Sequence, residues 1–387
     1  MEEIKEMPIT RQHVGLRALL PENDSSQASS VESGPVARQL RVLVIATEAP
    51  PVHGGIARIV GYLQNGFQER GHHVDVLAYP EIKRFQFGEA RLSSLIFKIP
   101  QLLNTIHTYD VIHVHGATPT VSDVALLLVR LRKKRPLVVY THHMDLDFKP
   151  IGFLNTLYNH VHRRLITQAD VVIASTKDNL RLLGGNRRRK SAIIPFGINL
   201  KHFNISGQKD TGFTVLFVGQ FRPYKGVRVL LQAMSQVPGA RLLIAGQGPE
   251  EKAYRALGQE LGLDVEFHTA VDDNQLRQLY QRSHAVVLPS VSRLEAFGIV
   301  LVEGMAAGCV PIASNLPGVR EVVGQTGFLF PVGDADWLAD ILRTLRDDPE
   351  QVQQISARAR IRAARFDHEH VISNYESLIT GLMGANE

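Results

Sequence analysis

The feature that most restricts the fold is an alternation of short apolar runs with longer stretches of helical spacing. In the first half of the chain these runs are rich in β-branched residues and cover residues 40–46, 74–79, 110–115, 136–141 and 170–175. Such runs are typical of strands that are covered on both faces. Because strand and helix alternate regularly, the pattern predicts a parallel, doubly wound sheet.

The same pattern restarts after a polar segment at residues 205–212. Five further apolar runs, again separated by helical stretches, cover residues 213–219, 240–246, 265–271, 285–290 and 309–314. We therefore predict an α/β chain of two Rossmann-like domains that face a central cleft. Ligands of such sheets bind beyond the carboxyl ends of the strands, so the loops after the strands are where functional residues are expected.

The domain limits follow from these patterns. Residues 1–38 contain the polar stretch PENDSSQASSVESGP and are expected to form a disordered tail. The first Rossmann-like domain is expected at residues 39–205 and the second at residues 206–365. Residues 366–387 include an amphipathic stretch, and we expect them to form a helix that packs back on the first domain.

Composition excludes several classes of protein. The single cysteine, Cys309, rules out an internal disulfide and a cysteine-based metal cage. No apolar run approaches the roughly 20 residues that span a bilayer. The first residues are acidic and lack the order of a secretory signal. These features predict a cytoplasmic protein.

The net charge of +5 is unevenly distributed, since residues 39–210 alone carry +11. A basic half suits a phosphate-rich partner. Basic stretches at residues 130–135 and 187–190, with the mixed aromatic and basic stretch 148–164, are compatible with docking on an anionic membrane face. They are equally compatible with solvated helix ends. Nucleic acid is not expected as a partner, because no recognition motif accompanies the charge.

Two loops carry groups suited to phosphate. Gly54 and Gly55 follow the first strand and open a helix, where missing side chains let backbone amides approach an anion. Arg222 and Lys225 lie in the loop after the first strand of the second domain, before the next helix. Two cations beside a helix N-terminus suit a diphosphate. A tight turn and a solvated turn are the alternative interpretations.

Two glutamates give the strongest signal. Glu295 lies in a loop after a strand, and Glu303 follows inside a helix expected to begin near Phe297. Glu303 stands in an apolar run, residues 299–307. A buried carboxylate is costly without a partner, so it needs either a ligand or a structural partner. Vicinal hydroxyls, as on a ribose, would suit it.

Around these residues the chain resembles the retaining family-4 glycosyltransferases of the GT-B fold. The family signature, two glutamates separated by seven residues, matches Glu295 and Glu303 in EAFGIVLVEGMAAGCVPIAS. Further similar segments extend from about residue 40 to 380, among them PPVHGGIAR, VVYTHH, IPFGIN, LFVGQFRPYKGV and TGFLFPVGD. The resemblance implies metal-independent sugar transfer, with retention, from a UDP- or GDP-linked donor to a saccharide or lipid-linked acceptor, without a cofactor. It suggests a role in cell-surface polysaccharide or glycolipid synthesis.

The resemblance also assigns roles to residues. Glu303 would bind the ribose and Glu295 the hydroxyls of the donor sugar, while Lys225 and nearby backbone amides would bind the diphosphate. The spacing in VVYTHH places the family's histidine at His143, near the donor sugar. The first domain would receive the acceptor and the second would bind the donor. The predicted catalytic residues are Glu295, His143 and Lys225, and the predicted donor-binding residues are Gly54, Gly55, Arg222, Lys225, Glu295, Phe297, Gly298, Ile299 and Glu303.

Departures and alternatives remain. The family's arginine after the strand glycine is Gln220 here, and Arg222 is the candidate to replace its charge. No metal site is expected, because the spacing of the histidines matches no recognised ligand set. Two other functions stay open: a sugar-nucleotide epimerase or hydrolase of the same fold, and a non-catalytic sugar-nucleotide-binding protein. Donor consumption with and without acceptor would separate them.

Overall fold

A computed structural model describes residues 38–52, 54–79, 84–87, 90–93, 95, 98–130, 136–144, 152–183, 190–204 and 207–384. The expected disordered tail lies outside these residues apart from Arg38, and so do parts of the three basic stretches. From Gln39 onwards the chain forms one compact unit. In this unit, none of the described helices is both long and apolar enough to cross a membrane.

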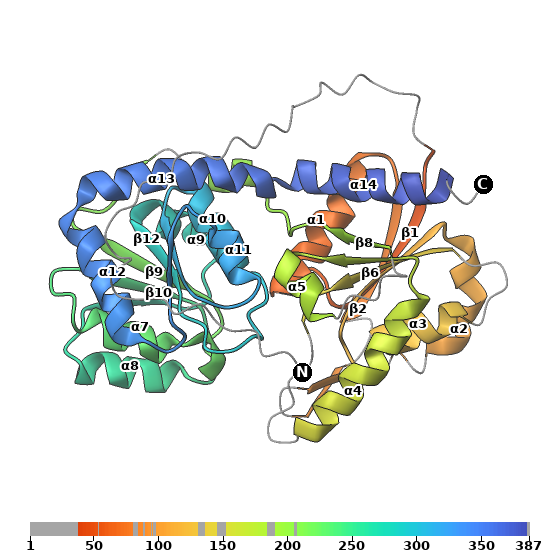
Figure 1. Ribbon diagram of the computed structural model, residues 1–387, viewed down its shortest axis with the longest axis horizontal. Helices are drawn as coiled ribbons and strands as arrows, with labels where there is room; N and C mark the ends of the chain where they lie inside the picture. Colours follow the sequence, from red (N-terminus) through yellow and green to blue (C-terminus); the bar gives the residue numbers. More distant parts are fainter. Residues whose placement is uncertain are drawn as a thin grey trace. The chain divides into compact units, whose positions relative to one another are not determined.

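The first sheet has six parallel strands in the order β2-β1-β5-β6-β7-β8 (Figure 1). Its strands are β1 (Arg41–Glu48), β2 (His73–Tyr79), β5 (Val111–Gly116), β6 (Leu137–His142), β7 (Val171–Ala174) and β8 (Ser191–Ile193). The helices between them are α1 (Gly55–Glu69), α2 (Ile99–Thr105), α3 (Ser122–Arg130), α4 (Gly152–Leu165) and α5 (Lys177–Leu182), and α6 (Leu200–Phe203) follows β8. A separate antiparallel hairpin pairs β3 (Arg84–Phe87) with β4 (Ala90–Ser93). We call this part, together with the last helix of the chain, the first lobe.

The second sheet repeats the plan, with six parallel strands in the order β11-β10-β9-β12-β13-β14. The strands are β9 (Thr214–Val218), β10 (Arg241–Ala245), β11 (Val265–His268), β12 (Ala285–Leu288), β13 (Val310–Ser314) and β14 (Phe328–Phe330). The helices are α7 (Val227–Met234), α8 (Glu251–Glu260), α9 (Asp273–Arg282), α10 (Ile299–Ala306), α11 (Val319–Val323), α12 (Ala335–Asp347) and α13 (Pro349–Ala363). This is the second lobe.

Two parallel sheets with interleaved helices confirm the predicted α/β class. The edge strands β8 and β14 are absent from the sequence prediction, because segments of three residues are too short to show a periodicity. Four short 3-10 turns complete the described elements: η3 (Ile106–Thr108), η4 (Ile166–Gln168), η5 (Pro223–Lys225) and η6 (Ala364–Phe366).

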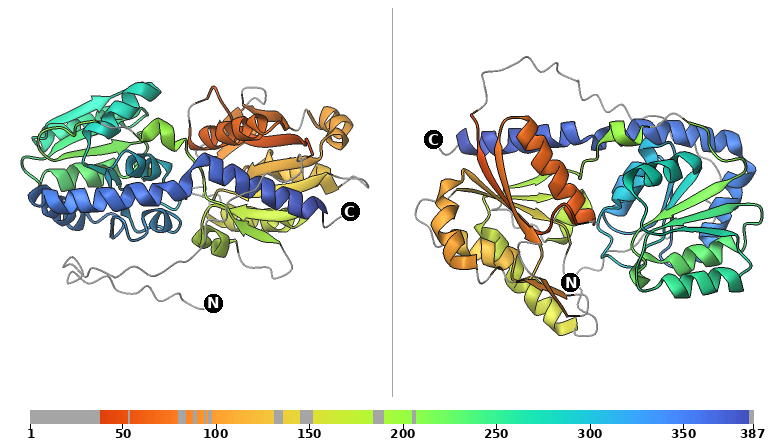
Figure 2. Two further views of the ribbon diagram at one scale, coloured as in Figure 1. Left: turned by 90° about the horizontal axis from the view of Figure 1, so that it is seen from above. Right: turned by 180° about the vertical axis from the view of Figure 1, so that it is seen from behind.

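The last helix, α14 (His368–Gly384), belongs to the first lobe although it ends the chain (Figure 1; Figure 2). It packs against α1, where a Cβ at Gly66 would lie 2.5 Å from Cγ1 of Ile372. Buried Ile372, Tyr375 and Ile379 join the hydrophobic core beneath it. Just before α14 the chain runs beside the segment that follows β8. There the amide of Ile198 donates to the carbonyl of Phe366 at 2.9 Å, and the carbonyl of Ile198 accepts from the amide of His368 at 2.9 Å.

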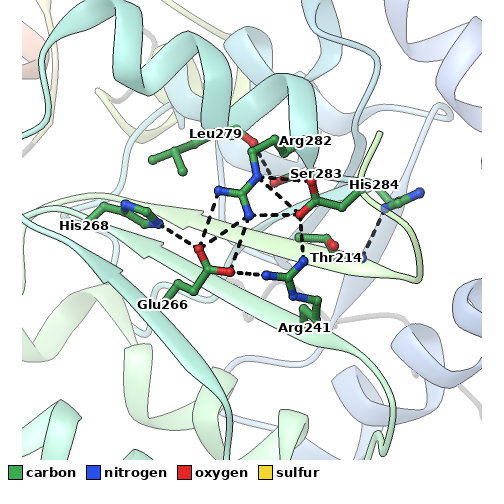
Figure 3. A network of polar contacts seen from close by, with 9 residues as sticks. Thr214, Arg241, Glu266, His268, Leu279, Arg282, Ser283 and His284 are labelled. Carbon is green, nitrogen blue, oxygen red and sulfur yellow. Dashed lines mark hydrogen bonds and ion pairs between the residues drawn. The ribbon is translucent and has the colours of Figure 1, made fainter. Parts of the chain in front are cut away.

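An ion-pair network lies at the amino-terminal end of the second sheet (Figure 3). Arg241 begins β10 and pairs with Glu266 of β11 and, at 3.2 Å, with Asp210. Arg282, at the end of α9, lies 3.0 Å from Asp210 and 3.4 Å from Glu266. Hydrogen bonding to Asp210 is the main cause that raises the pKa of Arg282. Since ligands bind at the opposite end of such sheets, this network holds the strands together rather than forming part of a site.

Candidate active site

Lys225 and Glu295 meet at the carboxyl ends of β9 and β12. The Nζ of Lys225 donates to Oε2 of Glu295 at 2.6 Å, and Oγ of Ser290 donates to the same oxygen at 3.2 Å. The two charged side chains are only 15% and 11% exposed. Among the described residues, none donates to Oε1 of Glu295. The pair therefore offers a fixed cation and one unused carboxylate oxygen.

Close contact between two loops positions this pair. Gly226 follows Lys225 with a φ of 69°, and a Cβ there would lie 1.9 Å from the carbonyl oxygen of Pro289. Only glycine fits both the left-handed conformation and the contact. The amide of Val291 donates to the carbonyl of Tyr224 at 2.8 Å and completes the junction. Lys225 is thereby held against the loop that carries Glu295.

The electrostatics keep Lys225 charged. Burial lowers its pKa, but the negative charge of Glu295 and the hydrogen bond to that carboxylate, together with the nearby Tyr224, outweigh burial and raise the pKa above its ordinary value. A lysine that stays protonated within the site can act as a permanent counter-ion for phosphate.

Glu303 has partners from both lobes. Its side chain is fully buried on α10, Nη1 of Arg58 donates to Oε1, and the hydroxyl of Tyr280 donates to Oε2 at 2.8 Å. Arg58 comes from α1 and also lies 4.0 Å from Asp273. The charge of Glu303 is the main cause that raises the pKa of Arg58. Of the two explanations that the sequence left open for this glutamate, the structure supplies a structural partner, and a ribose would have to share or displace it.

The two glycines at the start of α1 differ in their surroundings. A Cβ at Gly54 would lie 2.5 Å from Oε2 of Glu48, whereas a Cβ at Gly55 would have no atom within 4 Å. The amide of Arg58 donates to the carbonyl of Gly54 at 3.0 Å, which sets the first turn. A Cβ at Gly54 would thus force the carboxylate of Glu48 to shift. Gly55 borders open space at a helix N-terminus, where an anion is favoured.

Helix α10 begins at Ile299, two residues later than the sequence predicts. Gly298 precedes it with a φ of 80°, and a Cβ there would lie 2.7 Å from Leu288. The left-handed residue delays the helix. Phe297 is buried, its ring 4.9 Å from that of Phe196 and 5.8 Å from that of Phe366. Its side chain thus packs in the core, and only its backbone is placed to meet a ligand.

His143 lies directly after β6 and is 6% exposed. Its amide donates to the carbonyl of Gly116 at 2.7 Å, and its Nε2 lies 3.0 Å from Nδ1 of His115. Its ring is 5.2 Å from that of Phe196, which in turn contacts Phe297. Burial lowers the pKa of His143 to about 4. A neutral imidazole is therefore connected through two aromatic rings to the segment that opens α10.

The loop that carries Glu295 is also held by the first lobe. Nδ2 of Asn179, on α5, donates to the carbonyl of Ala296 at 2.8 Å. Beside it, Asp178 accepts from Nε of Arg320 at 2.6 Å, and Glu321 accepts from the amide of Asp178 at 2.5 Å. A shift between the lobes would therefore move this loop.

Arg222 lies just before the turn that contains Lys225. It is half-buried, and its carbonyl accepts from the hydroxyl of Tyr254 at 3.1 Å and from the amide of Lys225 at 3.0 Å. Gln220 is exposed. Replacement of the missing arginine charge by Arg222 remains a prediction.

Sequence reasoning missed Arg58, Tyr280 and His115. Arg58 is four residues after Gly54, so one helical turn returns its backbone to the face of the predicted anion site. That spacing could have drawn attention to it. Tyr280 lies in α9 among residues with ordinary helical spacing, and His115 belongs to the histidines whose spacing matches no metal site. For these two only the tertiary structure identifies a role.

Comparison with known proteins decides the family. A family model described as Glycosyltransferase Family 4 matches residues 53–202, and one described as Glycosyl transferases group 1 matches residues 199–362. The chain is 30% identical over 376 residues to the phosphatidyl-myo-inositol mannosyltransferase of Mycobacterium leprae, which covers 88% of this chain and 98% of that protein. The chain is a family-4 glycosyltransferase.

Two further likenesses support this family-4 glycosyltransferase assignment. The O-antigen chain mannosyltransferase C of Escherichia coli is 28% identical over 378 residues, covering 89% of this chain and 99% of that protein. Among solved structures, the sucrose-phosphate synthase of Thermosynechococcus elongatus superposes with a TM-score of 0.71 at 23% identity, covering 90% of this chain and 100% of that one. The structural likeness confirms the expected GT-B fold.

Proposed function

We propose that this family-4 glycosyltransferase transfers a hexosyl group, most simply mannosyl, from a UDP- or GDP-linked sugar to a hydroxyl of a lipid-linked or saccharide acceptor. The observation that carries the proposal is the buried pair of Lys225 and Glu295 at the carboxyl ends of two strands, with Glu295 just before the start of α10. Both named mannosyltransferase relatives support the choice of sugar, and their names support a role in glycolipid or surface-polysaccharide synthesis.

The residues divide the donor between them. Lys225 and the first amides of α10 would bind the diphosphate, with Gly55 at the start of α1 leaving room for its oxygens. The unused Oε1 of Glu295 would accept a hydrogen bond from a sugar hydroxyl. Glu303 would bind the ribose after Arg58 gives up its hydrogen bond to Oε1 of the carboxylate. No cofactor is needed for this chemistry.

The reaction itself needs little covalent help from the protein. The acceptor oxygen forms a bond to the anomeric carbon on the face from which the phosphate departs, and the bond between that carbon and the phosphate oxygen breaks. Because the new bond forms on the face from which the old one breaks, the configuration is retained, and the acceptor proton passes to the leaving phosphate. Lys225 and the N-terminus of α10 stabilise the negative charge that develops on the phosphate, without a metal ion. His143, neutral at pH 7, contributes a hydrogen bond rather than a charge.

The acceptor would enter at the first lobe. Helix α4 exposes Leu157 and Val161, 58% and 47% of whose surfaces are accessible, next to exposed Arg164. An apolar strip bordered by cations suits the surface of an anionic membrane. We therefore place the enzyme in the cytoplasm, peripherally attached to the membrane that holds a lipid-linked acceptor.

A donor assay with and without acceptor tests this function. GDP-mannose, UDP-glucose and related sugars would be incubated with the protein, with and without membrane lipids or oligosaccharides, and with or without a chelator. We expect nucleoside diphosphate release that depends on acceptor and survives chelation, with a product of unchanged anomeric configuration by NMR. Donor turnover without acceptor would instead indicate an epimerase or hydrolase, and binding without turnover a binding protein.

A further inference from the structure

His115 and His143 form a hydrogen-bonded pair whose geometry is set by the first sheet. His115 on β5 is in register with Thr141 on β6, and the amide of His143 extends the ladder by donating to Gly116. The planes of the two rings make an angle of 26°, and Nδ1 of His115 lies 3.0 Å from Nε2 of His143. His115 is 1% exposed. The backbone register thus holds the two rings against each other.

The positions of the ring protons follow from the surroundings. Both rings are neutral at pH 7, because burial lowers the pKa of His143 to about 4 and that of His115 well below its ordinary value. Each neutral ring carries one proton, and one nitrogen of the contacting pair must donate. The Nε2 of His115 is buried and has no partner among the described residues.

A buried N–H without an acceptor costs more than a bare lone pair, which fixes the tautomer. The proton of His115 therefore lies on Nδ1 and is donated to His143. The Nε2 of His143 accepts, so the proton of His143 lies on its Nδ1. Among the described residues, none accepts a hydrogen bond from that Nδ1.

We infer that His115 is a positioning residue that fixes His143 as a hydrogen-bond donor through Nδ1, aimed at an oxygen of the donor sugar. The inference rests on the proposed function, in which His143 lies beside that sugar. His113 packs against His115, with the two ring centroids 4.4 Å apart, and its own Nε2 lies 2.7 Å from Oγ1 of Thr141. Phe196 packs on the ring of His143 at 5.2 Å and limits its rotation.

Nitrogen NMR tests the tautomer directly. In the wild-type protein with ¹⁵N-labelled histidine, the signals of His143, identified by their loss in His143→Gln, should show protonated Nδ1 and bare Nε2 at pH 7. In His115→Leu the donor to Nε2 is lost, and the signature should move toward a mixture of tautomers. A protonated Nε2 in the wild-type protein would overturn the inference.

Matched substitutions test the effect on catalysis. The amide nitrogen of asparagine can occupy the place of histidine Nδ1, and that of glutamine the place of Nε2. We expect kcat to fall about tenfold in His115→Leu and His115→Gln, the scale of one lost hydrogen bond, and to be largely restored in His115→Asn. At the partner position, His143→Asn keeps the donor and should retain more activity than His143→Gln. Urea unfolding of each variant separates loss of fold from loss of position.

The results distinguish failure of this inference from failure of the proposed function. Full activity in His143→Ala would remove His143 from the site, and the inference with it. Loss of activity in His143→Ala, together with wild-type kcat and an unchanged His143 signature in His115→Leu, would leave the proposed function intact and refute the positioning role. Equal activity of His115→Asn and His115→Gln would likewise refute it, because only one of them replaces the Nδ1 donor.

Discussion

Arg58 and Glu303 connect the two lobes through a hydrogen-bonded ion pair whose carboxylate is fully buried. The guanidinium comes from α1, and the carboxylate lies in α10, which begins just after Glu295. Tyr280 binds the second oxygen of the carboxylate. The same glutamate thus holds the two lobes together and is the residue proposed to bind the ribose. These two roles can be measured separately.

Glu303→Ala should lower both stability and donor affinity. Two donors lose their acceptor, which costs about 2–3 kcal/mol of unfolding free energy, and donor binding should weaken by about 1.5–3 kcal/mol. Urea unfolding and calorimetric titration with the donor give the two values. Glu303→Gln, which can still accept from Tyr280, is the control. Unchanged donor affinity in a folded Glu303→Ala protein would restrict the glutamate to its structural role.

Lys225→Ala should raise the activation free energy of the reaction by more than it lowers the free energy of unfolding, because the charge of Lys225 is needed most as the phosphate leaves. The expected decrease in kcat is on the order of a hundredfold, comparable to the loss of one oxyanion donor. Arg222→Ala is the companion variant. If Arg222 replaces the charge missing at Gln220, its loss should weaken donor binding; behaviour like an ordinary surface substitution would refute that replacement.

Gly55→Ala should weaken donor binding without destabilising the protein. The new methyl group meets no atom within 4 Å, and alanine is favoured over glycine in a helix by about 1 kcal/mol. Only a ligand close to the backbone would be displaced. Gly54→Ala is the contrasting variant, because its methyl group would meet Glu48 and should lower the melting temperature. Donor affinity that is the same in Gly55→Ala as in wild type would place the diphosphate elsewhere.

Acid should destabilise the protein through its buried histidines. Burial lowers the pKa of His113 to about 3, against 6.5 for a free histidine, so between these pH values the unfolded chain binds more protons. The unfolding free energy therefore falls as the pH falls below 6.5, by about 1.4 kcal/mol per pH unit for this residue. His113→Gln can keep the hydrogen bond to Thr141 and removes the titration. Urea unfolding at pH 7 and pH 5 should show a loss about 2 kcal/mol smaller in the variant, and equal losses would contradict the assignment.

Binding to liposomes should depend on anionic lipid and salt. Each lysine or arginine near such a surface contributes about 1 kcal/mol, and salt screens it. Changing Lys149, Arg163 and Arg164 together to Ser should reduce sedimentation with anionic vesicles; Lys149 lies outside the described residues, and Arg163 also donates to the carbonyl of Leu182. A Leu157→Ser, Val161→Ser variant tests apolar insertion. Equal binding to neutral vesicles would favour insertion over charge, and binding to neither would indicate a soluble acceptor.

The fold could be predicted because buried parallel strands leave a strong local pattern. The rule that loops after strands meet at one edge also anticipated that Lys225 and Glu295 lie close together, and the structure brings them into contact. The delayed start of α10 could not be anticipated, because the sequence alone does not show that Gly298 adopts the left-handed conformation or that a side chain there would meet Leu288.

Contacts that depend on strand register, or on how the two lobes meet, could not be predicted from the sequence. The bond between His115 and His143 depends on which residues of β5 and β6 are paired, and a shift of one position would turn the rings to opposite faces. The bond between Arg58 and Glu303 joins residues 245 positions apart. A sequence pattern identifies that a buried glutamate needs a partner, but only the folded chain identifies the partner as Arg58.

The placement of α14 has a consequence for how the protein is made. Residues 39–203 of the first lobe leave the ribosome before the second lobe, yet Ile372, Tyr375 and Ile379, which join the same core, are translated only after the second lobe. At about 5–20 residues per second, the chain between α6 and α14 takes roughly 10–30 s to synthesise. During that interval the side of α1 that packs on α14 is uncovered. We therefore expect a chaperone to protect this apolar surface of the nascent first lobe until α14 has been made.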